Sequence, residues 1–304
     1  MYIREKGILI VAIDHGFCTI KTPNEVFDNG VKKLDTMPAF MENTIKYDNA
    51  YYKIGEGRLS MKDTKTLDDD YFILTLAAIA KEMERERITH ANKIVIAAGL
   101  PFGRYGAEKE DFAKYLKRGF VVFQYNDKTY SGKIDDVKLF PQCYAAVVNR
   151  LANMSPEQLI VDIGSKTIDV VHTKNHKPVE TECFSIPEAL IAATRQVENA
   201  IYNQMNKHIA EEQIQKIMMG EKCDLPEKYI EVCKQQLILF AKKVEGQLKE
   251  NGYDPEITPI VYCGGGACVM KLFGTIKEPH ICYMEDVKAN AIGYEFITGK
   301  MLRG

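Results

Sequence analysis

Two stretches of eight residues, DHGFCTIK (residues 14–21) and DIGSKTID (residues 162–169), decide the fold that we expect of this chain. Each begins with Asp-x-Gly directly after an apolar, β-branched run and places Ile before a charged residue at its end. A strand that breaks at such a turn is typical of a hairpin, and either stretch taken singly could be a plain one. Because the two lie almost half of the 304-residue chain apart, the repeat predicts two similar half-molecules that each present one turn.

The pattern around these stretches favours a layered α/β protein. We predict buried strands at the four apolar runs that end at glycine, residues 8–13, 93–98, 160–163 and 259–263. Helical patterns alternate with them at about residues 68–83, 187–207 and 226–251. In the first helix, Asp68 to Asp70 are expected to supply the cap, with the apolar residues on one face. Residues 99–106, with three glycines and a proline, are expected to form an irregular loop.

Composition and charge indicate an ordinary globular protein. The chain has 40 Lys and Arg against 42 Asp and Glu, which argues against a general nucleic-acid binder because phosphate recognition needs surplus positive charge. The longest early apolar run, residues 7–13, is too short for a membrane span and lacks a signal-peptide cleavage site, so we expect a cytoplasmic protein. The eight scattered cysteines form no Cys-x-x-Cys pair and are expected to be reduced and mostly buried.

An Asp-x-Gly turn suits a phosphate with a bound metal ion. Glycine permits the tight turn and the close approach of an anion to backbone N–H groups. The carboxylate at the strand end would repel phosphate unless a divalent cation lay between them. Two such turns facing one another therefore predict a clamp for a Mg²⁺-polyphosphate.

A second glycine-rich segment, Gly264 to Gly266, follows the last predicted strand. It could let the backbone pack flat against a nucleotide base or sugar, or it could be only a tight turn. The chain has neither the Gly-x-Gly-x-x-Gly nor the Walker pattern, so Rossmann and P-loop sites are not indicated.

In order along the chain, five segments resemble motifs of the actin-like ATPases and, within them, of the bacterial plasmid-segregation ParM/StbA group. The resemblance covers nearly the whole chain, and residues 99–101 and 55–75 are similar to the ParM branch in particular. The five segments are residues 14–21 and 162–169 (phosphate motifs), 139–146 (LFPQCYAA) and 289–293 (connecting motifs), and 262–267 (adenosine motif).

This resemblance implies an α/β fold of two related RNase H-like domains, of the actin and Hsp70 type, around a central nucleotide cleft. The implied domains are residues 1–157 with 284–304, and residues 158–283. The implied cofactors are ATP and Mg²⁺.

The same resemblance implies roles for individual residues. Gln142 would orient the attacking water, a task that suits an amide, and Asp162 would also be catalytic. Asp14 and Asp162 would hold Mg²⁺ through water, and Lys21 would reach the phosphates as a point charge. The other residues expected to contact the nucleotide are Gly16, Phe17, Cys18, Thr19, Gly164, Ser165, Lys166, Thr167, Asp169, Lys216, Gly264, Gly265 and Gly266.

Several of these assignments have alternatives. Gln142 could instead cap a helix or serve in packing, and Asp169 could support the water network or only bond the turn. Phe17 stands where actins often have a small polar residue that contacts the terminal phosphate, so that contact would come from the backbone or from Thr19. His15 is interpreted as structural, because no paired carboxylate supports a catalytic role. The adenine-contacting candidates are Gln215, Lys216 and Gly220.

The function implied by the resemblance is a polymerising ATPase that segregates plasmid DNA. Its expected partners are further copies of the chain in a polar filament and a DNA-bound adaptor protein, with no direct contact to nucleic acid or membrane. The alternative is a sugar or acid kinase of the same superfamily, but Gln142 favours hydrolysis over transfer. A chaperone is not expected, since the chain leaves no room for a substrate domain after the last motif.

Overall fold

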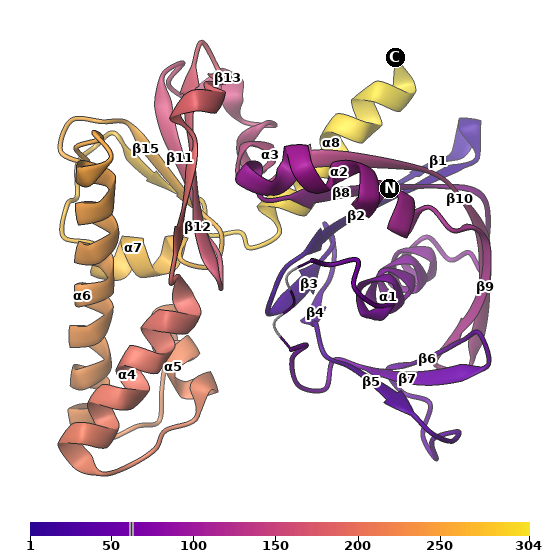
Figure 1. The fold of residues 1–304 in the computed structure, drawn as a ribbon, viewed down its shortest axis with the longest axis horizontal. Coiled ribbons are helices and arrows are strands. Elements are labelled where there is room, and N and C mark those ends of the chain that lie inside the picture. The colour runs from indigo at the N-terminus through magenta and orange to yellow at the C-terminus, as the bar shows by residue number, and fades with distance from the viewer. Residues whose placement is uncertain (61, 63) are drawn as a thin grey trace. The chain divides into compact units, whose positions relative to one another are not determined.

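A computed structural model of the chain describes residues 1–304 with the exception of Met61 and Asp63. These two residues fall in the ParM-like stretch 55–75 and lie outside the described residues. The chain divides into two compact units, Met1–Asn149 with Lys288–Gly304, and Arg150–Val287 (Figure 1). Within the described residues, none of the helices is both long and apolar enough to span a membrane.

The first unit contains a mixed sheet with the strand order β4-β3-β2-β8-β10-β9-β6-β7-β5, in which β1 also pairs with β2. The strands are β1 (Tyr2–Ile3), β2 (Ile8–His15), β3 (Thr19–Lys21), β4 (Val26–Asp28), β5 (Val31–Leu34), β6 (Thr44–Tyr47), β7 (Ala50–Ile54), β8 (His90–Leu100), β9 (Gly119–Tyr125) and β10 (Lys128–Pro141). The helices are η1 (Arg4–Lys6), α1 (Asp70–Arg85), α2 (Phe102–Leu116), α3 (Tyr144–Val147) and α8 (Ala289–Arg303).

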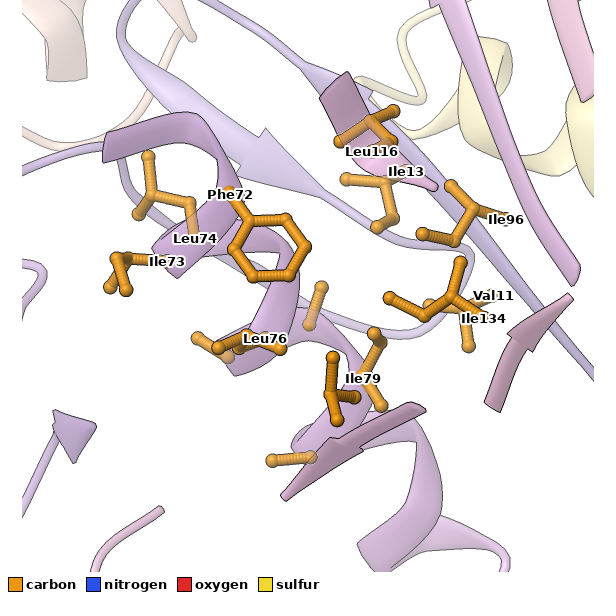
Figure 2. Packing of buried hydrophobic residues seen from close by; sticks show 14 of the residues in the cluster. Val11, Ile13, Phe72, Ile73, Leu74, Leu76, Ile79, Ile96, Leu116 and Ile134 are labelled. Carbon is orange, nitrogen blue, oxygen red and sulfur yellow. The ribbon is translucent and has the colours of Figure 1, made fainter. Parts of the chain in front are cut away.

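Strand β2 is buried on both faces, which explains its uninterrupted apolar sequence. Leu9, Val11 and Ile13 pack into the core that contains α1, and Figure 2 shows Val11 and Ile13 beside Ile96 of β8. The alternate residues Ile8, Ile10 and Ala12 belong to a separate cluster on the opposite face, with Tyr294 of α8. The predicted strands at residues 8–13 and 93–98 are therefore confirmed, and each is slightly longer than predicted.

Helix α1 differs from the expected one-faced helix. All its residues from Tyr71 to Ala80 are buried, and α1 contacts β2, β5, β6, β7 and β9. Figure 1 shows α1 lying inside the curve of the sheet. A helix that is enclosed by strands in this way must be apolar on most of its circumference, so the one-faced prediction was wrong. Asp69 occupies the cap position of α1 but makes no capping bond with its side chain. Instead, Asp68 Oδ1 accepts the Asp70 N–H at 3.1 Å, and the Tyr115 hydroxyl accepts the Phe72 N–H at 2.8 Å.

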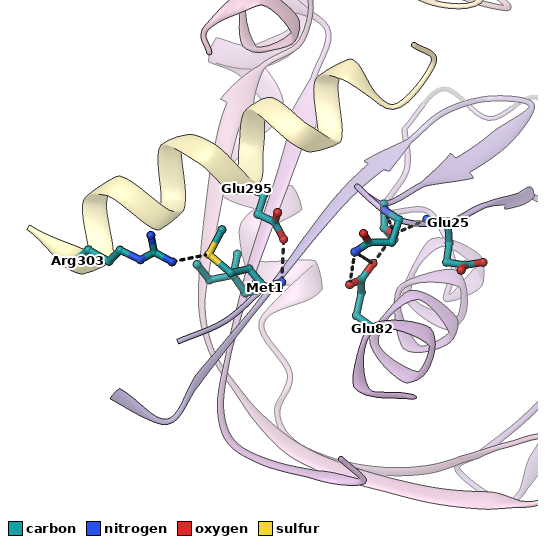
Figure 3. Close-up of polar contacts among 8 residues, drawn as sticks. Met1, Glu25, Glu82, Glu295 and Arg303 are labelled. Carbon is teal, nitrogen blue, oxygen red and sulfur yellow. Dashed lines mark hydrogen bonds and ion pairs between the residues drawn. The ribbon is translucent and has the colours of Figure 1, made fainter. Parts of the chain in front are cut away.

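A buried carboxylate ties α1 to the end of β3. Glu82 accepts hydrogen bonds from the Thr22 hydroxyl and from Asn24 Nδ2, the latter at 2.8 Å. Thr22 Oγ1 in turn accepts from the backbone N–H groups of Asn24 and Glu25. Figure 3 shows Glu82 reaching from α1 toward this turn. Because the carboxylate is 2% exposed and has several donors, it fixes the turn without being left unsatisfied.

The segment after residue 98 is regular, contrary to the expectation of an irregular loop. Strand β8 continues to Leu100, and α2 begins at Phe102 directly after Pro101. Proline suits this position because its φ of −50° leads into a helix. Gly103 and Gly106 lie in the first turns of α2, and the Cβ position of Gly106 faces open space. These glycines weaken the helix without breaking it.

Helices α3 and α8 meet at a glycine. A Cβ on Gly293 of α8 would overlap the carbonyl oxygen of Ala145 in α3, so only glycine permits this approach. Asn290 Oδ1 also accepts the backbone N–H of Cys143 at 3.1 Å. Two residues after Gly293 in α8, Glu295 Oε1 lies 2.7 Å from the Met1 ammonium (Figure 3). The two segments that resemble connecting motifs are therefore in contact.

The second unit has a sheet with the order β13-β12-β11-β15-β16, in which β14 pairs with β12. Its apolar core lies among this sheet and the helices α4 to α7. The strands are β11 (Gln158–Ile163), β12 (Thr167–Lys174), β13 (Lys177–Pro178), β14 (Phe184–Pro187), β15 (Ile260–Cys263) and β16 (Ile281–Tyr283). The helices are η2 (Leu151–Asn153), η3 (Glu180–Glu182), α4 (Leu190–Met205), α5 (Glu211–Met218), α6 (Glu227–Glu250) and α7 (Ala267–Phe273).

The two units repeat one five-strand arrangement. In the first unit the order is β4-β3-β2-β8-β10, and in the second it is β14-β12-β11-β15-β16. In both, the strand before the Asp-x-Gly turn pairs antiparallel with the strand after it and parallel with its other neighbour. The internal repeat in the sequence therefore corresponds to a repeat in the fold. The eight cysteines are all free, and four are buried, fewer than expected.

The contact between α3 and α8 gives a testable prediction. Gly293→Ala forces Ala145 and α8 apart and should destabilise the protein by about 1–3 kcal/mol. The control is Gly299→Ala in the same helix, where the nearest atoms to the new Cβ are 3.6 Å away in the Met1 side chain. That change should leave stability unchanged or raise it by up to about 1 kcal/mol. Urea unfolding of both variants measures the difference, and equal effects would contradict the packing described.

Candidate functional site

The first Asp-x-Gly hairpin is formed by β2 and β3. Asp14 pairs with Lys21 across the hairpin, and His15 pairs with Ile20. The Lys21 ammonium lies 3.4 Å from Asp14 Oδ2. A Cβ on Gly16 would lie 2.5 Å from the Thr19 carbonyl oxygen, so the turn requires glycine. The hairpin thus brings a buried carboxylate, a lysine and a glycine turn together.

Gln142 reaches the same carboxylate from the end of β10. Its backbone N–H donates to the Leu100 carbonyl at 2.8 Å, which fixes it beside the end of β8. Its Nε2 donates to Asp14 Oδ1 at 3.0 Å. Parallel strands β2, β8 and β10 end at one edge of the sheet, which explains how residues far apart in sequence meet here.

Asn29 supports the turn of the first hairpin. Its side-chain amide donates to the Phe17 carbonyl, and its backbone N–H donates to the Cys18 carbonyl at 3.1 Å. Asn29 is fully buried. Because both bonds use carbonyl groups of the turn, Asn29 sets the orientation of the peptide planes at Phe17 and Cys18. The sequence analysis missed this residue.

His15 is structural. The ring is fully buried between Tyr71 and Phe112, and its Nε2 lies 2.9 Å from the Thr75 hydroxyl. Burial, with a smaller effect of the nearby Lys65 ammonium, lowers the pKa of His15 well below its usual value. The ring is therefore neutral at physiological pH, and its contacts favour a structural or supporting role over a catalytic one.

Lys65 lies beside this hairpin and was also missed. Its ammonium donates to the His15 carbonyl at 2.7 Å and lies 5.7 Å from the ring centres of Tyr71 and Phe112. Burial lowers the pKa of Lys65 to about 8, although the nearby Asp14 carboxylate acts in the opposite direction. No periodic pattern in residues 55–69 marks this lysine, so the sequence offered no signal for it.

The second hairpin, formed by β11 and β12, has the same register as the first. Asp162 pairs with Asp169, and Ile163 pairs with Ile168. The Gly164 N–H donates to the Thr167 carbonyl at 3.0 Å and closes the turn. Asp169 accepts hydrogen bonds from the hydroxyls of Thr167 and Ser185. Of the two roles considered for Asp169, these contacts favour bonding of the turn.

The start of α4 orients the peptide groups of the second turn. The backbone N–H groups of Ala189, Leu190 and Ile191 donate to turn carbonyls at 3.0–3.4 Å. The acceptors are the carbonyls of Lys166, Gly164 and Ser165, respectively. In a trans peptide the C=O and N–H groups point in opposite directions. The N–H groups of Ser165 and Lys166 therefore point away from α4, an arrangement that suits an anion.

The glycine triplet packs against the end of β11. Gly264 has a φ of +76°, and a Cβ there would overlap Asp162 Oδ1. A Cβ on Gly266 would overlap the Ile163 side chain, so two of the three glycines are required by the chain's own packing. Gly265 differs, since its Cβ would lie 3.4 Å from Leu190 at ordinary contact distance. Of the three glycines, only Gly265 is not explained by packing within the protein, so it is the one that could be required for contact with a ligand.

The adenine-contacting candidates lie on and just after α5. Lys216 is exposed, and its ammonium makes no hydrogen bond or ion pair with a described residue. Gln215 bonds Glu211 on its own helix. Helix α5 contacts α7, which begins directly after the glycine triplet. Helix α5 therefore packs against the helix that follows the triplet, and the role of Lys216 toward a nucleotide stays a prediction.

The predicted site residues therefore form two groups, one in each unit. The first unit brings together Asp14, Gly16, Phe17, Cys18, Thr19, Lys21 and Gln142. The second brings together Asp162, Gly164, Ser165, Lys166, Thr167, Asp169, Gly264, Gly265 and Gly266. Their roles toward a ligand stay predictions.

Comparison with protein families gives two matches. Residues 12–144 match the model of the N-terminal domain of actin-like proteins. Residues 160–273 match the model of the C-terminal part of the archaeal, MreB-like actin homologue. No curated protein sequence matches the chain.

Solved structures of actin-like proteins resemble the chain over nearly its whole length. The archaeal actin homologue Ta0583 in complex with ADP has a TM-score of 0.75 at 18% identity, covering 96% of this chain and 99% of that one. The apo psk41 ParM protein has a TM-score of 0.74 at 15% identity, covering 98% of each chain.

A 15-stranded ParM filament from Clostridium botulinum has a TM-score of 0.69 at 19% identity, covering 96% of this chain and 99% of that one. At these identities the structures establish the fold. The chain therefore has the fold of the actin-like proteins, and each of its two units matches a model of one part of an actin-like protein.

Proposed function

We propose that this chain is an ATPase that assembles into nucleotide-dependent filaments. The observation that supports hydrolysis best is the bond between the Gln142 amide and the Asp14 carboxylate. That bond uses the N–H₂ group, so the amide oxygen stays available to accept a hydrogen bond from an attacking water and so orient it. Asp162, at the equivalent place in the second hairpin, is the other residue proposed as catalytic.

The contacts of Gln142 speak against its alternative role as a helix cap. The short helix α3 begins two residues later, with Cys143 at the cap position, and it is the Asn290 side chain that bonds the Cys143 N–H. The Gln142 side chain is instead directed to a carboxylate on a different strand. A glutamine that only filled space would not need this bond.

The donor set of the two hairpins fits Mg²⁺ bound through water. Mg²⁺ retains several waters and is commonly held by one or two carboxylates together with substrate phosphates. Asp14 and Asp162 are single buried carboxylates at strand ends, each beside a turn suited to an anion. We propose that they hold the ion, which would neutralise phosphate charge when bound. Lys21, the turn residues and Lys166 would orient the phosphates.

Assembly into filaments is proposed from the similarity to filament proteins. The matched Clostridium botulinum ParM structure is described as a filament, and the Ta0583 structure contains ADP. A polar filament needs two different complementary surfaces on each subunit. The net charge of −2 agrees with self-association and with recruitment of plasmid DNA through an adaptor protein. We also propose that these filaments segregate plasmid DNA.

Polymerisation is tested by light scattering of the purified chain with Mg²⁺ and ATP, with ADP, and without nucleotide. We expect strong scattering with ATP and weaker scattering in the other two conditions, because hydrolysis should weaken subunit contacts. Negative-stain microscopy should show filaments under the first condition. Equal scattering in all three samples would contradict a nucleotide-dependent filament. Phosphate transfer to a sugar or carboxylate acceptor in the same samples would instead support a kinase.

Hydrolysis is tested with three variants. Gln142→Ala should lower kcat on the order of 100-fold, because the water loses its orientation, and should leave ATP affinity largely intact. Asp162→Ala should abolish phosphate release. The control is Gln235→Ala, an exposed glutamine on α6. Phosphate release that is unchanged in both site variants would show that the assigned site is wrong.

The adenosine segment is tested by comparing two of its glycines. Gly265→Ala should leave stability within about 1 kcal/mol and lower nucleotide affinity, because its new Cβ meets only ordinary contacts in the protein. Gly264→Ala places a strained backbone against Asp162 and should destabilise the chain by about 1–3 kcal/mol. Urea unfolding and binding of a fluorescent adenine nucleotide measure the two effects. Unchanged binding by Gly265→Ala would leave the triplet as only a tight turn.

A further inference from the structure

Among the described residues, no carboxylate pairs with the Lys65 ammonium. Its contacts are one hydrogen bond to the His15 carbonyl and the faces of Tyr71 and Phe112. It makes no ion pair with a described residue. An ammonium has three donor hydrogens, so two of them are left for another acceptor. This lysine is also only partly exposed, which makes an unpaired charge costly to keep.

Neighbouring lysines are paired. Lys62, three residues earlier, forms ion pairs with Asp68 and Asp70. Lys21 of the first hairpin lies 3.4 Å from Asp14. The end of β2 therefore has two ammonium groups, from Lys21 and Lys65, near the Asp14 carboxylate. A second carboxylate that acts on Lys65, Glu108, forms an ion pair with Arg104. Among the described residues of this region, Lys21 and Lys62 have carboxylate partners, so the positive charge that is not balanced is that of Lys65.

The electrostatic surroundings of Lys65 favour an anion beside its ammonium. Burial is the main reason that the pKa of Lys65 falls to about 8. Lys21 lowers this pKa further, while Asp14 raises it. A phosphate close to the ammonium would replace the lost hydration with a charge-assisted hydrogen bond. An anion at this position would thus offset the free-energy cost of burying the Lys65 charge.

The place of Lys65 relative to the turn indicates which anion fits. Its hydrogen-bond partner His15 is the residue directly before Gly16, so the ammonium lies at the start of the turn. Phe17 has no polar side chain that could contact a phosphate, and its carbonyl accepts a hydrogen bond from the Asn29 side chain. A cationic donor from the loop before α1 would supply the polar contact that the turn itself lacks.

We propose that Lys65 binds the terminal phosphate of a bound nucleoside triphosphate and makes the chain prefer triphosphate to diphosphate. This inference rests on the proposed function, since it assumes that the hairpins bind nucleotide. The terminal phosphate carries the greatest charge of the three and is absent from a diphosphate. Lys65 is therefore a specificity-determining residue as well as a phosphate ligand.

The test compares affinities for ADP and for a non-hydrolysable ATP analogue by calorimetry with Mg²⁺ present. Lys65→Met should weaken binding of the ATP analogue about 10- to 100-fold, the range for loss of a charged hydrogen bond, and that of ADP less than about threefold. Lys65→Arg should recover part of the preference because it keeps the charge. The matched control is Lys62→Met, which removes the same charge from the same loop and should lower both affinities equally or not at all.

The outcomes separate the two proposals. Equal weakening of both nucleotides by Lys65→Met, or no weakening, would overturn the role of Lys65 while leaving nucleotide binding established. A wild-type chain that binds neither nucleotide would instead overturn the proposed function. Circular dichroism checks that each variant folds. If Lys65→Met does not fold, Lys65→Gln, which keeps a hydrogen-bond donor without the charge, is measured in the same way.

Discussion

The buried carboxylate of Asp14 is the constraint around which the first unit is organised. A charge that is 5% exposed must be paired and hydrogen-bonded, or it destabilises the fold by several kcal/mol. Its partners come from two places, Lys21 across the hairpin and Gln142 from a strand two positions away in the sheet. The order of the parallel strands and the register of the hairpin are both needed to bring these groups to one carboxylate.

The repeated five-strand arrangement explains why so much of the fold could be predicted. The Asp-x-Gly stretches carry local signals, an apolar β-branched run and a glycine turn, that do not depend on distant residues. The predicted strands at residues 160–163 and 259–263 correspond to β11 and β15, which pair in parallel. Helices α4 and α6 begin and end within three residues of the prediction because proline, glycine or asparagine marks their ends. Only tertiary contacts could show which strands are neighbours.

The features that could not be predicted depend on long-range packing. The burial of α1 on all sides requires the sheet to curve round it, and its sequence alone is compatible with a one-faced helix. Gly103 and Gly106 indicated a loop because glycine is a poor helix former, yet the start of α2 tolerates both. Asn29 and Lys65 act on the first hairpin through a carbonyl contact from another part of the chain. Such contacts leave no periodic trace in the sequence.

The attachment of α4 to the second turn couples the orientation of the turn peptides to the direction of the helix axis. Three hydrogen bonds join its first residues to carbonyls of the turn, so a change in the orientation of these peptide planes must move the helix axis as well. With 16 residues, α4 is about 24 Å long at 1.5 Å per residue. A tilt of about 5° at the turn would displace its far end, near the exposed Tyr202, by about 2 Å over that length. A small reorientation of the turn peptides would thereby become a displacement of about 2 Å at the surface of this unit.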